Sequence, residues 1–205
     1  MFKCLSQLLI CCVLFYQVGM SQKKSYQLGE EIENFTLRNV DAKNVSLSDF
    51  KDLKGVVVVF TCNHCPFSQL YESRIIKLAK NLPGKNFFLI AINPNDSTQV
   101  PEDSFVEMIK IARRKKYNFP YLHDATQEVA KIFGAARTPH FFVLQNKNGS
   151  FILRYKGALD DDPEQTKGSE ARKYVEQVVE ALVRNAEELP YVESKAVGCT
   201  IKWRK

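Results

Sequence analysis

The stretch GVVVVFTCNHCPF, residues 55–67, joins an unbroken apolar run to two cysteines spaced as Cys-x-x-Cys. A run so rich in β-branched valine is typical of a strand buried at the centre of an α/β sheet. From Pro66 as far as Leu82, apolar residues recur at helical spacing. The sequence therefore predicts a buried strand followed at once by a helix, with Cys62 and Cys65 at the turn between them.

The rest of the chain alternates between expected strands and expected helices. Strands are expected at 35–40, 86–93 and 121–124, helices at 101–116, 126–134 and about 170–185, and a hairpin at 140–145 and 150–157. Strands joined by helices imply parallel pairs with right-handed crossovers, and the hairpin adds antiparallel strands. The predicted fold class is therefore α/β, with a mixed central sheet and helices on both faces.

Length and composition indicate one globular domain of ordinary size. The chain has 205 residues, of which 45% are hydrophobic and 25% are charged. Its net charge of +6 is mild, and its densest basic run is RRKK at 113–116. A solvated helix face explains that run better than nucleic-acid binding, so we expect no nucleic-acid partner.

The first 21 residues differ from the rest of the chain. A short positive start is followed by a mostly apolar segment that ends in Gly19 and Ser21, small residues before a cleavage site. This is the pattern of a secretory signal peptide, and the apolar part is shorter than a membrane-spanning helix requires. We expect a signal peptide at 1–21, a folded domain at 22–188 and a C-terminal tail at 189–205. The protein should be exported, periplasmic or secreted, with no stable membrane insertion after signal cleavage.

Three of the six cysteines lie in the expected signal peptide. The mature protein keeps Cys62 and Cys65 as a close pair and Cys199 as a distant thiol. Disulfides persist in exported compartments, so the close pair could be oxidised at rest. Apolar residues in the tail predict that it docks on the domain. Cys199 is then either a leftover thiol or a second resolving cysteine.

The position of the close pair favours redox chemistry. Unpaired N–H groups and the positive end of the helix dipole stabilise a thiolate, and such cysteines have pKa values from about 3.5 to 7. We expect Cys62 to be the more exposed nucleophile and Cys65 the resolving thiol. His64 can add positive charge or a hydrogen bond, and Pro66 suits the first helical turn. An inert structural disulfide and half of a zinc site are the alternatives, but zinc needs three or four ligands and no second Cys-x-x-Cys exists.

A second signal lies about 75 residues further on, in the stretch ARTPHFFVL at 136–144. Thr138 and Pro139 stand just before a buried strand, with Arg137 before them and His140 after them. By itself, a proline at the start of a strand indicates no more than a strand at the edge of a sheet.

Together these features resemble the thioredoxin superfamily and, within it, the redoxin branch that contains alkyl hydroperoxide reductase and thiol-specific antioxidant proteins. The branch's opening pattern stands here as GEEIENFTL at 29–37, and the resemblance covers roughly residues 27 to 157. Further motifs resemble a group of bacterial exported thioredoxin-family proteins: CNHCP at 62–66, PEDSF at 101–105, RTPH at 137–140 and VGCTIKW at 197–203.

The resemblance implies a thioredoxin-like three-layer sandwich and an exported thiol–disulfide oxidoreductase. A cis peptide bond before Pro139 would pack beside the redox pair and present backbone to a peptide substrate. The implied partners are protein thiols or disulfides, or small thiol or peroxide substrates, together with a redox partner that recharges the pair. The redox equivalents reside in Cys62 and Cys65, so no cofactor is expected. The buried acid of thioredoxin would fall near Val56, where no acid stands, so the proton acceptor is not identified.

Two other functions remain open at this point. In a peroxiredoxin-like peroxidase, Cys65 would be the peroxidatic residue and Arg137 would stand near the site of the family's arginine. Cys62 then occupies the position where that family has threonine or serine. A copper chaperone would combine Cys62, Cys65 and His140 as sulfur and imidazole ligands.

Overall fold

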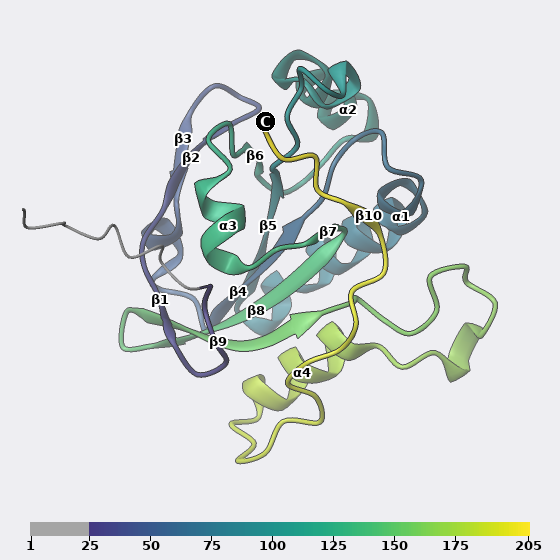
Figure 1. Cartoon of the computed structure of the whole chain (residues 1–205). Helices are drawn as coiled ribbons and strands as arrows, with labels where there is room; N and C mark the ends of the chain where they lie inside the picture. Colours follow the sequence, from purple (N-terminus) through teal and green to yellow (C-terminus); the bar gives the residue numbers. More distant parts are fainter. Residues whose placement is uncertain (1–24) are drawn as a thin grey trace, which may run out of the picture.

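The computed structural model describes residues 25–205, so the expected signal peptide at 1–21 lies outside the described residues. Eight strands of the described part form one mixed sheet (Figure 1). In their order across the sheet, they are β1 (Glu31–Ile32), β9 (Ser150–Gly157), β8 (His140–Lys147), β4 (Gly55–Phe60), β5 (Phe87–Asn93), β6 (Tyr121–His123), β2 (Thr36–Asn39) and β3 (Asn44–Ser46).

Strand β4 lies at the centre of this sheet, as its valine run predicts. It pairs in parallel with β5 and antiparallel with β8, and all six of its residues are buried. Successive side chains of a strand point to opposite faces. Val57 and Val59 therefore enter one hydrophobic core, and Val56 and Val58 enter the other.

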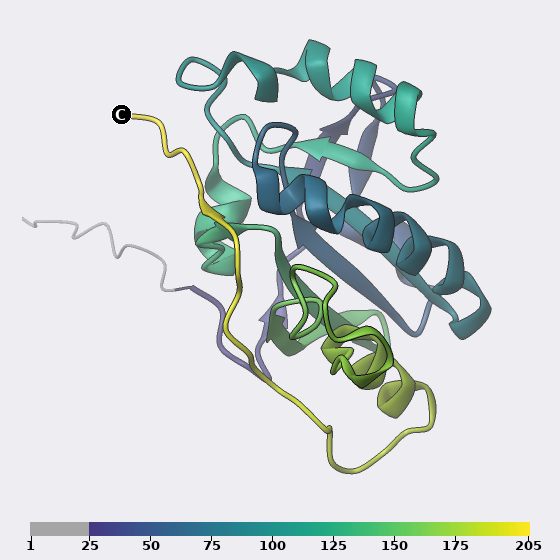
Figure 2. The same ribbon diagram turned by 90° about the vertical axis from the view of Figure 1, so that its right-hand side faces the viewer.

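Helices cover both faces of the sheet, which confirms the expected thioredoxin-like three-layer arrangement. Helices α1 (Pro66–Asn81), α2 (Phe105–Lys115) and α4 (Tyr174–Val183) pack on the face of Val57 (Figure 2). Helix α3 (Glu128–Phe133) packs on the opposite face. No helix among residues 25–205 is both long and apolar enough to cross a lipid bilayer.

Two expected helices have different bounds in the structure. The single helix expected at 101–116 is wrong, because a 3-10 turn at Pro101–Asp103 is separated from α2 by the extended residue Ser104. The turn exists because Asp103 is buried and accepts hydrogen bonds from residues beside the cysteines. Helix α4 is shorter than the expected 170–185, since it begins only at Tyr174.

The C-terminal tail runs along the domain, as its apolar residues predict. Its short strand β10 (Cys199–Thr200) pairs antiparallel with β7 (Arg137–Thr138). In Figures 1 and 2 the yellow tail passes close to the start of α1. Ile201 is 3% exposed and joins the core on the α3 face. The tail sequence has neither the apolar spacing of a helix nor that of a strand, because contacts with distant residues hold the tail in place.

Candidate redox site

The two cysteines lie at the turn from β4 into α1, as predicted. Cys62 follows the strand by two residues, and Cys65 is the N-cap residue of α1, directly before Pro66. Cys62 is 6% exposed and Cys65 is fully buried. Cys62 is thus the more exposed of the two, although both are largely covered.

The segment around Pro139 packs against this turn. The register of β4 and β8 sets Phe60 opposite His140, which brings the residues beyond the strand end close to Thr138. The Thr138–Pro139 peptide bond is cis, as the resemblance implies. Thr138 is fully buried, with its Oγ1 3.3 Å from Cys62 Sγ and its carbonyl oxygen 3.2 Å from Cys65 Sγ.

The disulfide of the structure joins Cys65 to Cys199, and Cys62 is a free thiol. The Cα atoms of Cys65 and Cys199 are 6.2 Å apart, and Cys199 lies opposite Thr138 in the β7–β10 pair. In this state the two cysteines of the Cys-x-x-Cys motif are therefore not bonded to each other. All three cysteines of residues 25–205 meet around one residue, Thr138.

A buried acid that sequence reasoning missed stands beside the cysteines. Asp103 has no exposed surface, and its Oδ1 accepts hydrogen bonds from the backbone N–H groups of Asn63 (2.6 Å) and His64 (3.2 Å). Its Oδ2 lies 2.6 Å from His64 Nδ1 and accepts a hydrogen bond of 2.7 Å from the side-chain amide of Asn95. His64 Nδ1 is also 3.9 Å from Cys62 Sγ. The same nitrogen of His64 therefore faces both the Cys62 thiol and the Asp103 carboxylate.

The acid reaches the site from a different element than in thioredoxin. Val56 is buried within β4, where no acid stands, whereas Asp103 enters from the 3-10 turn before α2. Asp103 belongs to the motif PEDSF. Acidic residues are common in the first turn of a helix, so the sequence pattern gives no indication that this one is buried.

Burial raises the pKa of Cys62 from its ordinary value of 9.0 to about 11, and the negative charge of Asp103 adds to the increase. Hydrogen bonds from Thr138 and Ser68 lower this pKa, but they do not offset burial. The expectation of a low thiol pKa is therefore wrong for this state. Desolvation disfavours the charged thiolate more than the helix start stabilises it. Cys62 is consequently a protonated thiol at neutral pH.

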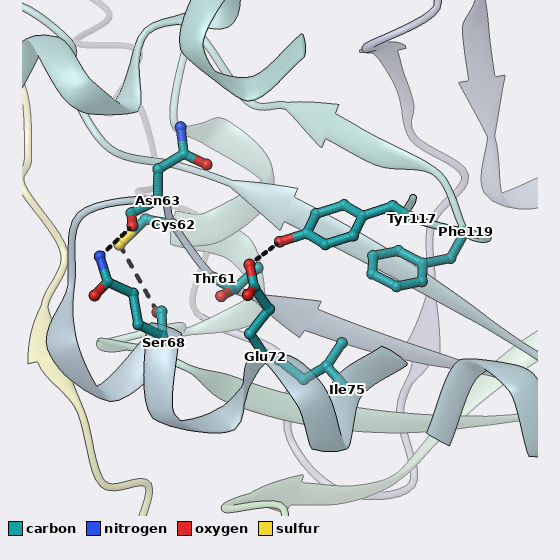
Figure 3. A pocket seen from close by; sticks show the side chains of 9 residues that line it. Thr61, Cys62, Asn63, Ser68, Glu72, Ile75, Tyr117 and Phe119 are labelled. Atoms are coloured by element: carbon teal, nitrogen blue, oxygen red, sulfur yellow. Dashed lines mark hydrogen bonds between the residues drawn. The ribbon is translucent and has the colours of Figure 1, made fainter. Parts of the chain in front are cut away.

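Cys62 opens onto a small pocket that extends away from the tail (Figure 3). Beside the thiol, Ser68 Oγ lies 3.8 Å from Cys62 Sγ. At the far end, the Tyr117 hydroxyl donates a 2.8 Å hydrogen bond to Glu72. The full lining consists of Thr61, Cys62, Asn63, Ser68, Gln69, Glu72, Ile75, Tyr117 and Phe119.

The remaining predicted site residues face other groups. Arg137 Nη1 donates a 2.9 Å hydrogen bond to the backbone oxygen of Gly198 in the tail. His140 is buried, and its ring lies against Phe142. Burial, together with the positive charges of Lys156 and Arg137, lowers the pKa of His140 to about 4, so its imidazole is neutral at neutral pH.

One group of three metal-ligating side chains comes together within residues 25–205. It comprises Cys62, His64 and Asp103, whose ligand atoms all lie within 4.8 Å of one another. His140 is not a member of this group, and Cys65 is occupied by its disulfide. Three hydrogen bonds, from the backbone N–H groups of Asn63 and His64 and from the side-chain amide of Asn95, fix the Asp103 carboxylate in place. Its fourth contact is with the His64 ring, which it therefore holds in a defined position.

The chain is similar to known proteins both in sequence and in structure. The chain is 28% identical over 145 residues to the thiol-disulfide oxidoreductase ResA of Bacillus cereus, covering 69% of this chain and 77% of that protein. An uncharacterised conserved protein of Geobacillus kaustophilus has a similar structure, with a TM-score of 0.79 and 37% identity over 87% of this chain and 93% of that one. A hypothetical protein of Sinorhizobium meliloti 1021 gives a TM-score of 0.78 and 31% identity over 88% and 97% of the two chains.

The family assignment rests on a family model that matches more than half of the chain. The model of the AhpC/TSA family matches residues 28–161, from before β1 to beyond β9. This span includes the Cys-x-x-Cys turn, Asp103 and the cis-proline segment. The chain therefore belongs to the AhpC/TSA family.

Proposed function

We propose that this protein is a thiol–disulfide oxidoreductase whose reacting groups are Cys62 and Cys65. The observation that carries the proposal is the contact of a free thiol and a disulfide-bonded sulfur with the same residue, Thr138. Thiol–disulfide exchange needs a thiolate and a disulfide sulfur within reach of each other. The similarity to proteins named thiol-disulfide oxidoreductase supports the same chemistry.

In the proposed reaction, Cys62 attacks a sulfur of the substrate disulfide once Cys65 is a thiol. A Cys62–substrate disulfide forms, and one substrate sulfur leaves as a thiol after taking up a proton. The Cys65 thiolate then attacks the Cys62 sulfur, which releases the second substrate thiol and leaves a Cys62–Cys65 disulfide. The substrate is reduced by two electrons, and the cysteine pair is oxidised by two. The reverse sequence oxidises a substrate dithiol.

The raised pKa of Cys62 means that a base has to take its proton. The proposed acceptor is the Asp103 carboxylate, an oxygen of which lies within 4.8 Å of the Cys62 sulfur. His64 Nδ1 lies 2.6 Å from Asp103 Oδ2 and 3.9 Å from the Cys62 sulfur, so its N–H donates to the carboxylate and can turn to the thiolate once the carboxylate has taken the proton. In this view Asp103 is the base that the β4 strand lacks, and His64 is a positioning residue.

Export is the second part of the proposal. The signal-peptide pattern at 1–21 and a disulfide between Cys65 and Cys199 both suit an oxidising compartment. Expression of the full chain with N-terminal sequencing tests it. The mature protein should begin near Gln22 and appear in the exported fraction, and an uncleaved protein in the cytoplasm would contradict export.

The activity is tested with a model protein disulfide and a chemical reductant. The wild-type protein should accelerate reduction, and Cys62→Ser should abolish this acceleration. Cys65→Ser should instead accumulate a covalent mixed disulfide, because the resolving thiol is missing. Ser104→Ala is a matched control, since it changes a hydroxyl near the site without touching a sulfur. Full activity in both cysteine variants would refute the proposed function. Rapid consumption of hydrogen peroxide that depends on Cys65 would favour the peroxidase alternative.

A further inference from the structure

Many contacts besides the disulfide hold the C-terminal tail in place. Ile201 is buried, and its N–H donates a 3.3 Å hydrogen bond to the Ala136 carbonyl. Further hydrogen bonds to tail residues 202–204 come from side chains and backbone near β5 and α3. They join Asn95 Oδ1 to Lys202 N, Asp96 N to Lys202 O, Gln127 Nε2 to Lys202 O, Gln99 Nε2 to Trp203 O and Gln127 Oε1 to Arg204 N.

The position before Cys199, which Gly198 occupies, accepts only glycine. A Cβ atom on Gly198 would lie 2.3 Å from the Thr138 carbonyl oxygen and 2.7 Å from its carbon. Both of these are backbone atoms that cannot move aside cheaply. The guanidinium of Arg137 donates to the Gly198 carbonyl from the neighbouring strand. Glycine thus permits the close approach that brings Cys199 to Cys65.

None of these contacts involves a sulfur atom, so they do not depend on the disulfide. When the Cys65–Cys199 bond opens, the tail keeps its anchor at Ile201 and its hydrogen bonds around Lys202. The Cys199 sulfur then stays beside Cys65 at a high effective concentration, as a tethered reactant does. A flexible tail that carried a leftover thiol would lack this anchorage.

We propose that Cys199 is a second resolving thiol and that the three cysteines form a sulfur relay. This inference rests on the proposed function. The Cys62 thiolate attacks the Cys65 sulfur of the Cys65–Cys199 disulfide. The bond between Cys62 and Cys65 forms, and the bond between Cys65 and Cys199 breaks. Cys199 leaves as a thiolate and takes up a proton, and the electron count of the protein does not change.

The relay gives each sulfur a separate task. The Cys65–Cys199 disulfide stores the oxidised state between Cys65, which has no exposed surface, and the half-buried Cys199. Cys62 lines the pocket, which extends away from the tail, and exchanges with substrate (Figure 3). Strand β10 meanwhile covers the backbone edge of Arg137 and Thr138, so an extended peptide cannot pair with that edge while the tail is docked.

The relay predicts how the stored disulfide is reduced. The oxidised protein is treated with a small dithiol, quenched in acid, alkylated and mapped by peptide mass spectrometry. In the wild type, Cys65–Cys199 should be lost through a transient Cys62–Cys65 species. In Cys62→Ser the same disulfide should be reduced at least about tenfold more slowly, because the buried Cys65 sulfur is no longer attacked by Cys62 and the dithiol has only the half-buried Cys199 sulfur to attack. Equal rates in the two proteins would make Cys65–Cys199 a structural disulfide and overturn the relay.

The anchorage is tested with Ile201→Ala, which leaves every cysteine in place. At equilibrium, the ratio of Cys65–Cys199 to Cys62–Cys65 should fall at least about tenfold, since the effective concentration of Cys199 drops. Ile201→Val is the milder control, and circular dichroism checks that both variants fold. An unchanged ratio in folded Ile201→Ala would contradict the proposal.

Cys199→Ser separates the relay from the proposed function. It should form only Cys62–Cys65, and its turnover with the model disulfide should change at least about tenfold. If this variant turns over at the wild-type rate, the relay fails and the proposed function stands. If Cys62→Ser and Cys65→Ser also retain full turnover, the proposed function itself fails.

Discussion

The Cys62 thiol should react slowly with small alkylating reagents although it follows a strand and precedes a helix. Its pKa of about 11 leaves a thiolate fraction of about one in a thousand at pH 8. A thiol at the ordinary value of 9.0 has about one thiolate in ten at the same pH. We therefore expect alkylation about a hundredfold slower than that of an ordinary thiol, before any further loss through limited access.

The measurement is the rate of iodoacetamide labelling of Cys62 in the oxidised protein between pH 7 and pH 10.5. Limited access multiplies the rate by a constant, whereas the thiolate fraction rises tenfold with each pH unit below the pKa. The logarithm of the rate should therefore increase with a slope of about one up to about pH 10 and flatten only as the pH approaches the pKa of about 11. Cys62→Ser gives the background labelling. A rate that levels off below about pH 9 would refute the burial argument.

Asp103→Asn separates the two effects that we assign to the acid. Removal of its negative charge should lower the pKa of Cys62 and speed labelling at pH 8, because Asp103 is the second cause of the raised value. The same substitution should slow turnover with a model disulfide, because an amide cannot take the Cys62 proton. A merely structural role would slow turnover without faster labelling in the folded protein. Parallel increases in labelling and turnover would contradict the role of Asp103 as the base.

Three further outcomes concern stability and are measured by urea unfolding. The pKa of His140 is lowered from 6.5 to about 4, so the folded state resists a proton that the unfolded chain accepts. His140 alone should therefore remove about 3 kcal/mol of stability between pH 7 and pH 4, and the loss of stability over this range should be smaller by about that amount in His140→Gln. Arg74→Met should cost about 3 kcal/mol, because it leaves the largely buried Asp160 carboxylate without its 2.6 Å partner, whereas Lys110→Ala at an exposed ion pair should change stability by less than about 0.5 kcal/mol. Gly55→Ala should cost about 1–3 kcal/mol or more, because its Cβ would lie 2.3 Å from a backbone oxygen of β8.

The fold and the position of the close cysteine pair could be predicted because their signals are local. Six consecutive buried residues in β4 require an apolar run, and α1 requires helical spacing after Pro66. The hairpin of β8 and β9 follows from two such runs around a turn, and the structure confirms it. The cis bond before Pro139 is also confirmed, but the resemblance to known proteins was needed to expect it.

The other half of the site depends on contacts between distant residues. Asp103 reaches Asn63 across 40 positions in the chain, and the disulfide spans 134 positions. An acid at the start of an expected helix is ordinarily exposed, and nothing in the local pattern marks Asp103 as buried. The sequence likewise pairs Cys65 with its near neighbour Cys62, whereas the structure bonds Cys65 to the distant Cys199 and leaves Cys62 free. Burial also reversed the expected direction of the Cys62 pKa shift, and burial is a property of the whole fold.

Asp103 links the geometry of the cysteine turn to its proton chemistry. Buried carboxylate oxygens need hydrogen-bond donors, and two donors to Asp103 are the backbone N–H groups of Asn63 and His64. These N–H groups belong to the same turn that carries Cys62 and Cys65. A shift of this turn during sulfur exchange would therefore alter the hydrogen bonds of Asp103, and with them its hold on the His64 ring. The carboxylate that adds to the raised pKa of the resting thiol is thus hydrogen-bonded to the turn that carries both exchanging sulfurs, so the geometry of that turn and the protonation of Cys62 are coupled through Asp103.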